Sequence, residues 1–266
     1  MSDNIIKIFS AIILAFVVFI NSIGNFIGVG DIIPTQPEET TVSTSETTTV
    51  FDGDLPQTEE EIVAYFNTAI NKAKSNSKSI TSNYMKHAVA GEITGMPAAV
   101  ASIGQTVIED NMGEDEGMKN ITWTLAADKN AFFPVENETW SSKLTADDVK
   151  SATITENNGK YTVIITTRHD ARSENHKHGE GHAPKAFNVV LPGLINENIP
   201  GIVKTMFGVK SASVAYPAST VKVTVDAATG NVISANYLLY WTIYLPLNGT
   251  DVILPFSTEN DYTINW

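Results

Sequence analysis

The apolar residues of this chain recur with one period before about residue 121 and with another period after it. Between residues 58 and 76 the spacing is helical and gives one stripe, made of Ile62, Phe66, Ala69, Ile70 and Ala73. Thr58 and Glu61 have the spacing of a capping box, which predicts that an amphipathic helix begins there. A weaker stripe predicts a second helix near residues 97–110.

From about residue 121 onward, apolar and polar residues alternate, starting with Ile121, Trp123 and Leu125. Residues 151–156 and 161–168 flank the turn sequence Asn-Asn-Gly and predict a β-hairpin. Residues 220–226 and 231–245 flank a second turn and predict another hairpin, and residues 252–257 and 262–266 predict the last strands. The predicted fold class is α+β, with N-terminal helices packed on an antiparallel β-sheet.

The predicted strand at residues 237–245 is apolar on both faces. Its odd-numbered positions carry Tyr, Leu, Trp, Ile and Leu, and its even-numbered positions carry Leu, Tyr, Thr and Tyr. We therefore expect both faces to be covered, one by the helices and the other by the curl of the sheet, by loops or by a ligand. A strand within a closed core is the main interpretation, and we expect Trp241 to be buried, as we do Phe66 of the helix.

The N-terminal region predicts export. Residues 5–33 are almost uninterrupted in their apolar character, with Lys7 before the strongest stretch and acidic residues after it, which orients the rest of the chain to the outside. Residues 1–33 fit either a signal peptide or an uncleaved signal anchor. Residues 34–57, rich in Thr, Ser, Glu and Pro, predict a disordered tether, and residues 58–266 predict a single domain, held at the cell membrane or secreted.

Composition excludes several classes of protein. The absence of cysteine rules out disulfides, thiol catalysis, cysteine-based zinc sites and a lipid-modified N-terminal cysteine, and it favours a bacterial source. The net charge of −13 leaves no basic surface for nucleic acid, so no nucleic-acid partner is expected. Anionic lipids would be repelled as well, so contact with the membrane is expected only through the N-terminal apolar segment.

Four parts of the chain carry a resemblance: residues 140–153, the hairpin around Gly159, residues 221–226 with Thr229 and Gly230, and residues 261–266. In these parts the chain resembles an uncharacterised group of exported proteins from gut clostridia. The resemblance covers most of residues 58–266 and implies the fold and the export, but no activity. The Asp-x-x-Thr-Gly turn at residues 226–230 also resembles, more loosely, a turn of lipoprotein-carrier proteins. That likeness implies a curled, half-barrel-like sheet and, by analogy, carriage of an apolar ligand.

Four of the five histidines lie in residues 168–184, a segment that we call the histidine loop: His169, His176, His178 and His182. Imidazole is a common ligand of zinc, nickel and copper, and three imidazoles with a water form a known zinc arrangement. His176 and His178 would point the same way if the loop were extended, and His182 would close a third position.

The position of the histidine loop argues against a defined metal site. It lies between the predicted strand at residues 161–167 and residues 187–191, so we expect a solvated, mobile hairpin loop without supporting contacts. An exposed loop with weak metal binding or none is the main interpretation, and no cofactor is otherwise predicted.

No catalytic motif is present, so we predict that the protein is not an enzyme. Asp147 and Asp148 are interpreted as capping residues, and Glu136 and Glu138 beside Trp140 suggest a sugar-binding patch or a carboxylate pair only weakly. The leading hypothesis is an extracytoplasmic, non-catalytic binding module for a protein, glycan or lipid ligand. The alternatives are a carrier of a lipid or other apolar ligand and a metal-binding protein that uses the histidine loop.

Overall fold

The computed structural model describes residues 55–96, 101–102, 105–106, 109, 112–199, 211–247 and 250–266. The leader and most of the tether therefore lie outside the described residues, as does most of the helix predicted at residues 97–110. The described positions of that segment, 101, 102, 105, 106 and 109, are helical. In the part of the chain that is described, no helix is both long and apolar enough to cross a membrane.

The α+β fold class is confirmed. In chain order the main elements are α2 (Glu59–Asn76), β1 (Ser79–Val89), β2 (Ile121–Trp123), α4 (Ala126–Phe132), β3 (Val149–Asn157), β4 (Lys160–Thr167), β5 (Asp170–Ser173), α5 (Pro192–Asn198), β6 (Ser213–Tyr216), β7 (Thr220–Asp226), β8 (Val232–Leu247) and β9 (Thr250–Asn265). The described residues also contain three short 3-10 turns, η1 (Glu116–Met118), η2 (Ala146–Asp148) and η3 (Ala183–Lys185).

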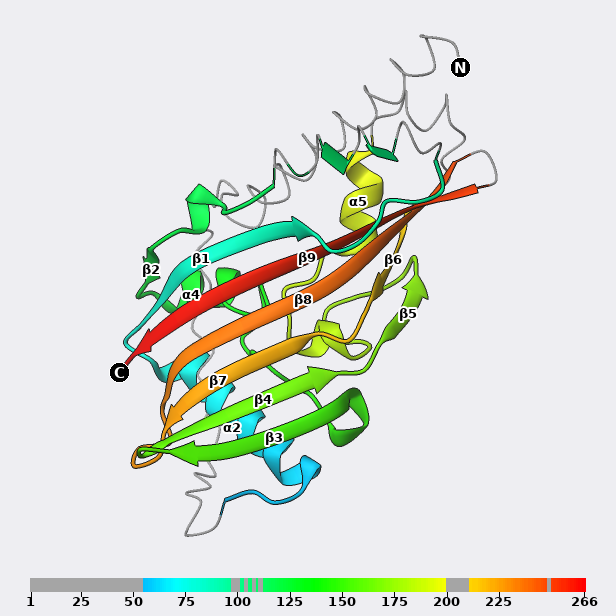
Figure 1. Ribbon diagram of the computed structural model, residues 1–266. Helices are drawn as coiled ribbons and strands as arrows, with labels where there is room; N and C mark the ends of the chain where they lie inside the picture. The colour runs from blue at the N-terminus through cyan, green and yellow to red at the C-terminus, as the bar shows by residue number, and fades with distance from the viewer. Residues whose placement is uncertain are drawn as a thin grey trace, which may run out of the picture.

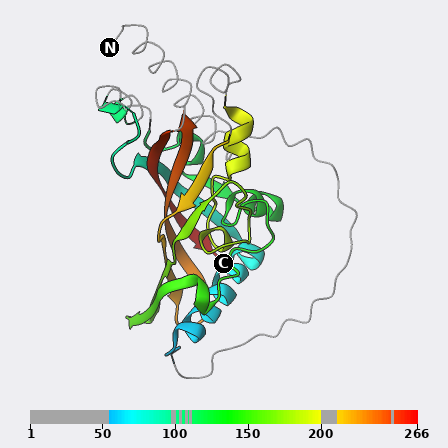
Figure 2. The same cartoon turned by 90° about the vertical axis from the view of Figure 1, so that its right-hand side faces the viewer.

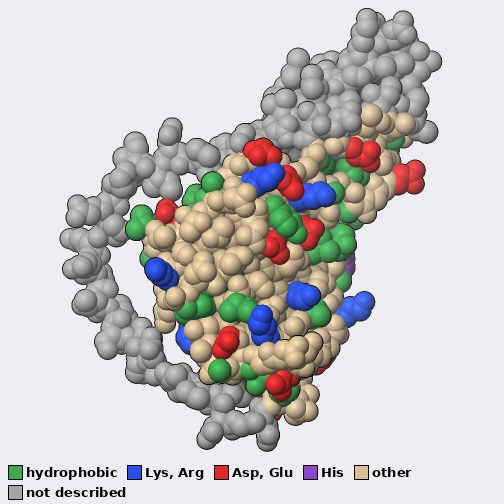
Figure 3. All heavy atoms as spheres, turned by 60° about the vertical axis from the view of Figure 1, so that its left-hand side comes forward, with side chains coloured by type: hydrophobic (Ala, Val, Ile, Leu, Met, Phe, Trp, Pro, Cys, Tyr) green, Lys and Arg blue, Asp and Glu red, His purple; other side chains and the backbone are tan. Residues whose placement is uncertain are grey.

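The strands form one open antiparallel sheet in the order β2-β1-β9-β8-β7-β4-β3, and β6 pairs with both β8 and β5 (Figure 1). Figure 2 shows that α2 (cyan) and α5 (yellow) lie on the same side of this sheet. We call that side the inner face. Helix α2 packs on β3, β4 and β8 there, next to α4. Figure 3 shows a surface on which acidic and basic side chains are interspersed.

Helix α2 forms as its sequence predicts. The side chain of Thr58 accepts a hydrogen bond from the backbone of Glu61, whose carboxylate accepts one from the backbone of Thr58, so the capping box is complete. All five residues of the predicted apolar stripe are buried, and Phe66 is fully so. The helix is therefore fixed by its own capping residues and by the apolar face that it places on the sheet.

Both predicted hairpins are confirmed. Asn158 and Gly159 adopt φ angles of 52° and 71° between β3 and β4, as a two-residue hairpin turn requires. In the turn between β7 and β8 the carboxylate of Asp226 accepts hydrogen bonds from the backbone of Ala228 and Thr229. Gly230 then takes a φ of 67°, which a side chain would strain.

Three strand predictions were wrong in detail. The segments expected to form two closing strands, residues 252–257 and 262–266, belong to the single 16-residue strand β9. The polar residues between them did not break the strand, because they alternate between the two faces of the sheet as apolar residues would. Leu125 is 64% exposed and precedes α4 instead of extending β2, and residues 187–191 form no strand.

The two faces of β8 are covered unequally, against expectation. Its odd-numbered residues from Tyr237 to Leu245 are buried on the inner face, Trp241 among them. On the outer face Leu238, Tyr240 and Tyr244 are only half-buried. Helices α2 and α5 lie on the inner side of the sheet (Figure 2), so neither of them covers the outer face.

Candidate functional site

The histidine loop is largely solvated, as the sequence predicted, with nine of its seventeen residues exposed. It is not the unsupported hairpin loop that was expected, because several contacts dock it on the domain. It contains β5, which pairs with β6, and Arg172 of that strand forms an ion pair with Asp251 of β9. It ends at η3, where Ala183 and Pro184 are buried. The prediction of a hairpin failed because β4 does not pair with β5, the next strand in the chain. Its second neighbour in the sheet, besides β3, is β7, so the segment that follows β4 does not connect two paired strands.

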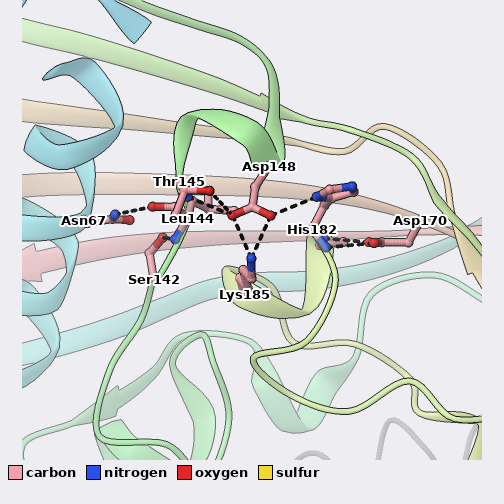
Figure 4. A network of polar contacts seen from close by, with 9 residues as sticks. Asn67, Ser142, Leu144, Thr145, Asp148, Asp170, His182 and Lys185 are labelled. Atoms are coloured by element: carbon pink, nitrogen blue, oxygen red, sulfur yellow. Dashed lines mark hydrogen bonds and ion pairs between the residues drawn. The ribbon is translucent and has the colours of Figure 1, made fainter. Parts of the chain in front are cut away.

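The carboxylate of Asp148, in η2, is the centre of the contacts that hold the end of the loop (Figure 4). It is 3% exposed. Nδ1 of His182 lies 2.9 Å from Oδ1, and Nζ of Lys185 lies 2.8 and 2.9 Å from the two oxygens. Thr145 donates from its backbone and its hydroxyl, each at 2.8 Å, so Asp148 is a capping residue as predicted and an anchor as well.

The charge of Asp148 is maintained by these donors. Burial alone would raise the pKa of its carboxyl, but hydrogen bonds from Lys185, His182 and Thr145 outweigh burial and lower the pKa. Asp148 is therefore ionised at neutral pH, and the Lys185 ammonium compensates its charge.

A second buried carboxylate, Asp170, fixes the backbone of the same turn. Its two oxygens accept hydrogen bonds from the backbone N–H groups of His182 at 2.7 Å and Ala183 at 2.8 Å. Gly181 approaches so closely that a Cβ atom there would lie 2.6 Å from Oδ1 of Asp170, and its φ is 85°. A glycine is thus required at this position for the carboxylate to reach the turn.

Helix α2 holds the neighbouring segment, residues 133–144, through its polar side. The ammonium of Lys74, 1% exposed, donates to the carbonyl oxygens of Phe133, Val135 and Trp140 at 2.8, 2.7 and 3.2 Å. Asn71 bonds the backbone of Ser142 with both its oxygen and its nitrogen. The segment is therefore fixed to the helix by polar contacts to its backbone.

The electrostatics of Lys74 have two opposing parts. Burial lowers its pKa to about 7, while the carboxylates of Glu138 and Glu136 act against that shift. The three carbonyl groups favour the ammonium, because a neutral amine has only two N–H donors for three acceptors. We therefore treat Lys74 as charged in the folded protein at neutral pH.

Glu136 and His178 meet where the histidine loop crosses residues 133–144. Oε1 of Glu136 lies 3.9 Å from Nε2 of His178, and their side chains are 18% and 20% exposed. Burial raises the pKa of Glu136 to about 7, against the effect of Lys74, and burial lowers the pKa of His178, against the effect of Glu138. At the same place the Lys143 ammonium lies 4.1 Å from the centre of the half-exposed Trp140 ring.

The structure does not bring the four predicted metal ligands together. His169 is exposed, and Nε2 of His176 lies 3.1 Å from the carbonyl of Ala171. His178 faces Glu136, and His182 is bonded to Asp148. Among the described residues no group of three or more His, Cys, Asp and Glu side chains is arranged to hold a metal ion. Metal binding by the loop stays a prediction.

The arrangement at His182 resembles one part of a catalytic triad, because a buried carboxylate orients the imidazole through Nδ1. Within the described residues, however, no hydrogen bond joins this ring to a hydroxyl group that would serve as a nucleophile. The charged groups of this region are instead bonded to one another and to the backbone. Their combined effect is to join the histidine loop, residues 133–144 and α2.

Sequence reasoning missed Lys74 and Lys185, and it considered Asp170 only as a possible oxygen ligand of a metal, not as a residue that fixes the backbone. A signal for Lys74 was present, since Asn67, Asn71 and Lys74 recur at helical spacing and form a polar stripe beside the apolar one. Asp170 and Lys185 carried no such signal, because their partners are set by how the loop docks.

Comparisons with protein-family models, with curated proteins and with solved structures found no match to this chain.

Proposed function

We propose that this protein is a non-catalytic binding module that acts outside a bacterial cell, held at the membrane by residues 1–33 or released from it. The apolar leader and the polar tether in the sequence support the location. The non-catalytic role is supported by one observation above all. The buried charged groups Asp148, Lys185 and Lys74 have their hydrogen-bonding capacity taken up in holding three chain segments together.

The surface that these contacts fix is the candidate binding surface, made of Glu136, Glu138, Trp140, Lys143 and His178. It combines a half-exposed aromatic ring with groups of both charges. Because the buried contacts hold it in one arrangement, a ligand would meet a preorganised surface and lose little entropy in ordering it. Its mixed polar and aromatic character favours a glycan or a peptide over a purely apolar ligand.

The test uses the full-length protein against arrays of glycans and peptides, with two variants. Trp140→Ala removes the aromatic group from the binding surface, and Lys150→Ala changes an exposed residue of β3 outside it. We expect binding to fall at least about tenfold in the first variant, the equivalent of about 1.4 kcal/mol, and to be unchanged in the second. Equal binding by all three proteins, or substrate turnover that Asp148→Asn abolishes, would contradict the proposal.

Carriage of an apolar ligand is a second candidate, favoured by the inner face of the sheet beyond α2. There β8 and β9 carry one continuous set of apolar side chains: Leu239, Trp241, Ile243, Leu245, Val252, Leu254 and Phe256. These side chains are buried in the structure, so an apolar ligand would have to displace the part of the chain that covers them. A curled, half-barrel-like sheet would suit such a ligand. Native mass spectrometry of the purified protein tests this candidate, since a retained lipid supports it and a mass equal to that of the bare chain argues against it.

A further inference from the structure

Five polar residues lie together on the inner face of β1, β9 and β8. In the register of the strands, Ser82 of β1 lies opposite Tyr262 of β9, and Tyr237 of β8 lies opposite Asn260 of β9. His87 of β1 lies opposite Thr258 of β9, on the same face. The same face carries Met85, Phe256 and Leu239, all buried in the core. We call the following set the polar band: Ser82, His87, Tyr237, Asn260 and Tyr262.

The polar band is buried, and one atom of each of its side chains lacks a hydrogen-bond partner. Ser82, Tyr237, Asn260 and Tyr262 are between 0% and 5% exposed, and His87 is half-buried. In the described part of the chain no partner is found for the following atoms: Oγ of Ser82, Nε2 of His87, the hydroxyl of Tyr237, Oδ1 of Asn260 and the hydroxyl of Tyr262. Buried polar atoms in folded proteins are nearly always hydrogen-bonded, so five unpaired ones in one place call for a ligand.

A neighbouring residue shows what pairing looks like on this face. Oγ1 of Thr258 accepts a hydrogen bond from Nε1 of Trp241 at 3.1 Å and lies 3.0 Å from Nδ1 of His87. Among the described residues, the five unpaired atoms have no such hydrogen-bond partner. The backbone groups of these strands are bonded between neighbouring strands and are not free to serve them.

We propose that the polar band binds a row of ordered water molecules, which supply the hydrogen bonds that its five unpaired atoms lack. The proposal depends on the fold alone and not on the proposed function.

The chemistry of the unpaired atoms favours water. Three are hydroxyls, which donate and accept, one is an amide oxygen, which only accepts, and one is an imidazole nitrogen. Burial lowers the pKa of His87, so the ring is neutral and the band carries no charge to attract an ion. A ligand there has to be small, neutral and able both to donate and to accept, and water has these properties.

The surroundings of the polar band restrict it further. The ring of Phe133 lies 4.9 Å from that of Tyr262, and the ring of Phe187 lies 5.5 Å from that of Tyr237, so aromatic groups cover the two hydroxyl-bearing rings. Burial raises the pKa of Tyr262, and the charge of Glu136 adds to that effect, which places the partly exposed Glu136 close to this end of the band. Exchange of water with solvent would take place at this end.

The first test compares three buried tyrosines by thermal unfolding of the full-length protein. Tyr216 is fully buried and donates to the carbonyl of Val190 at 3.1 Å, so Tyr216→Phe loses a known hydrogen bond and serves as the control. If the band is hydrated, Tyr237→Phe and Tyr262→Phe also lose a hydrogen bond, and each should lower Tm by about 2–4 °C, as the control does. If the band is dry, both changes remove an unpaired hydroxyl, and an unchanged or higher Tm would overturn the proposal.

The second test is a crystal structure at high resolution. We expect density for water oxygens about 3 Å from the unpaired atoms, with at least one water bonded to two residues of the band. Well-ordered side chains with no such density between them would overturn the proposal, whatever the melting temperatures show.

Discussion

The docked histidine loop and the polar band are both buried polar regions, but their polar atoms are paired in different ways. In the loop region the carboxylate of Asp148 has four donor groups around it, and Lys74 has three acceptors. In the polar band, within the described residues, five atoms have no partner at all.

The difference follows from the backbone around each region. Turns and irregular segments leave N–H and C=O groups unpaired, and the side chains of Lys74 and Asp170 bind those groups. Strands use their backbone groups on each other, so polar side chains of strands have only one another or water. A buried polar residue thus finds backbone partners in an irregular segment, whereas on a sheet it needs another side chain or water. The predictions below test this contrast.

The largest effect is expected for Lys74→Met. The change leaves three backbone carbonyls and the nearby Glu136 without their cation, and we expect the free energy of unfolding to fall by about 3–5 kcal/mol in urea titrations. Lys72→Met, an exposed change on the same helix, should cost less than about 1 kcal/mol. Similar losses in the two variants would show that the loop region does not depend on this buried ammonium.

A smaller effect is expected for Asp148→Asn. The amide keeps the shape but loses the charge that binds Lys185 and His182, at a cost of about 2 kcal/mol. Trypsin should then cleave the histidine loop more readily at the exposed Lys177. Mass spectrometry of the fragments measures this cleavage. Asp147→Asn, at the exposed neighbouring position, is the control, and trypsin should cleave this variant at the same rate as the native protein. Equal cleavage of both variants would mean that Asp148 does not hold the loop.

The next effect depends on pH and concerns Glu136. Its pKa is raised by burial from 4.5 to about 7, so between these values the folded protein keeps a proton that the unfolded chain has lost. The stability that Glu136 contributes is fully present below pH 4.5 and is lost as pH rises through 7.

Glu136→Gln removes this dependence. Relative to the native protein, the variant should gain about 3 kcal/mol as pH rises from about 4.5 to about 7 and little beyond. Comparing the two proteins at each pH cancels the contributions of the titrating groups that do not interact with Glu136. Lys74 does interact with it, so the same comparison in the Lys74→Met background isolates the contribution of Glu136. A difference that stays constant between about pH 4.5 and pH 7 would show that Glu136 titrates normally and is not held in a buried site.

The smallest effect is expected from metal. His182 would have to leave Asp148 before it joined His176 and His178 on one ion, so zinc or nickel should raise Tm by less than about 1 °C. Any shift should disappear below about pH 6, and in the triple variant His176→Gln, His178→Gln, His182→Gln. A stoichiometric metal that survives purification would contradict this expectation and make the histidine loop the functional centre.

The parts of the fold that the sequence predicted are those fixed by residues close together in the chain. Thr58 and Glu61 cap α2 across three residues, and Asn158 with Gly159 forms a turn whose conformation both residues favour. The continuity of β9 was missed because the polar residues at its centre were taken as a break in the strand. They remain in the strand because β1 and β8 pair with them on either side.

The candidate site was less predictable for the same reason. The contact of Asp148 with Lys185 spans 37 residues, and that of Lys74 with Val135 spans 61. The pattern of histidines was visible in the sequence, but the partners that separate His176, His178 and His182 depend on the docking of the whole segment.

The position of β9 in the sheet has a consequence for how the chain reaches its folded form. This strand lies between β1 and β8, so among the described strands β1 and its edge neighbour β2 join the rest of the sheet only through residues 250–265. If the chain crosses a membrane N-terminus first, α2 and β1 emerge early and must wait for about 160 further residues before their neighbour arrives, a long loop to close. A chain arrested in translocation before Thr250 lacks β9, so protease should digest both the part before this missing strand that contains β1 and the part that contains β8. Folding would be completed only at the last step of export.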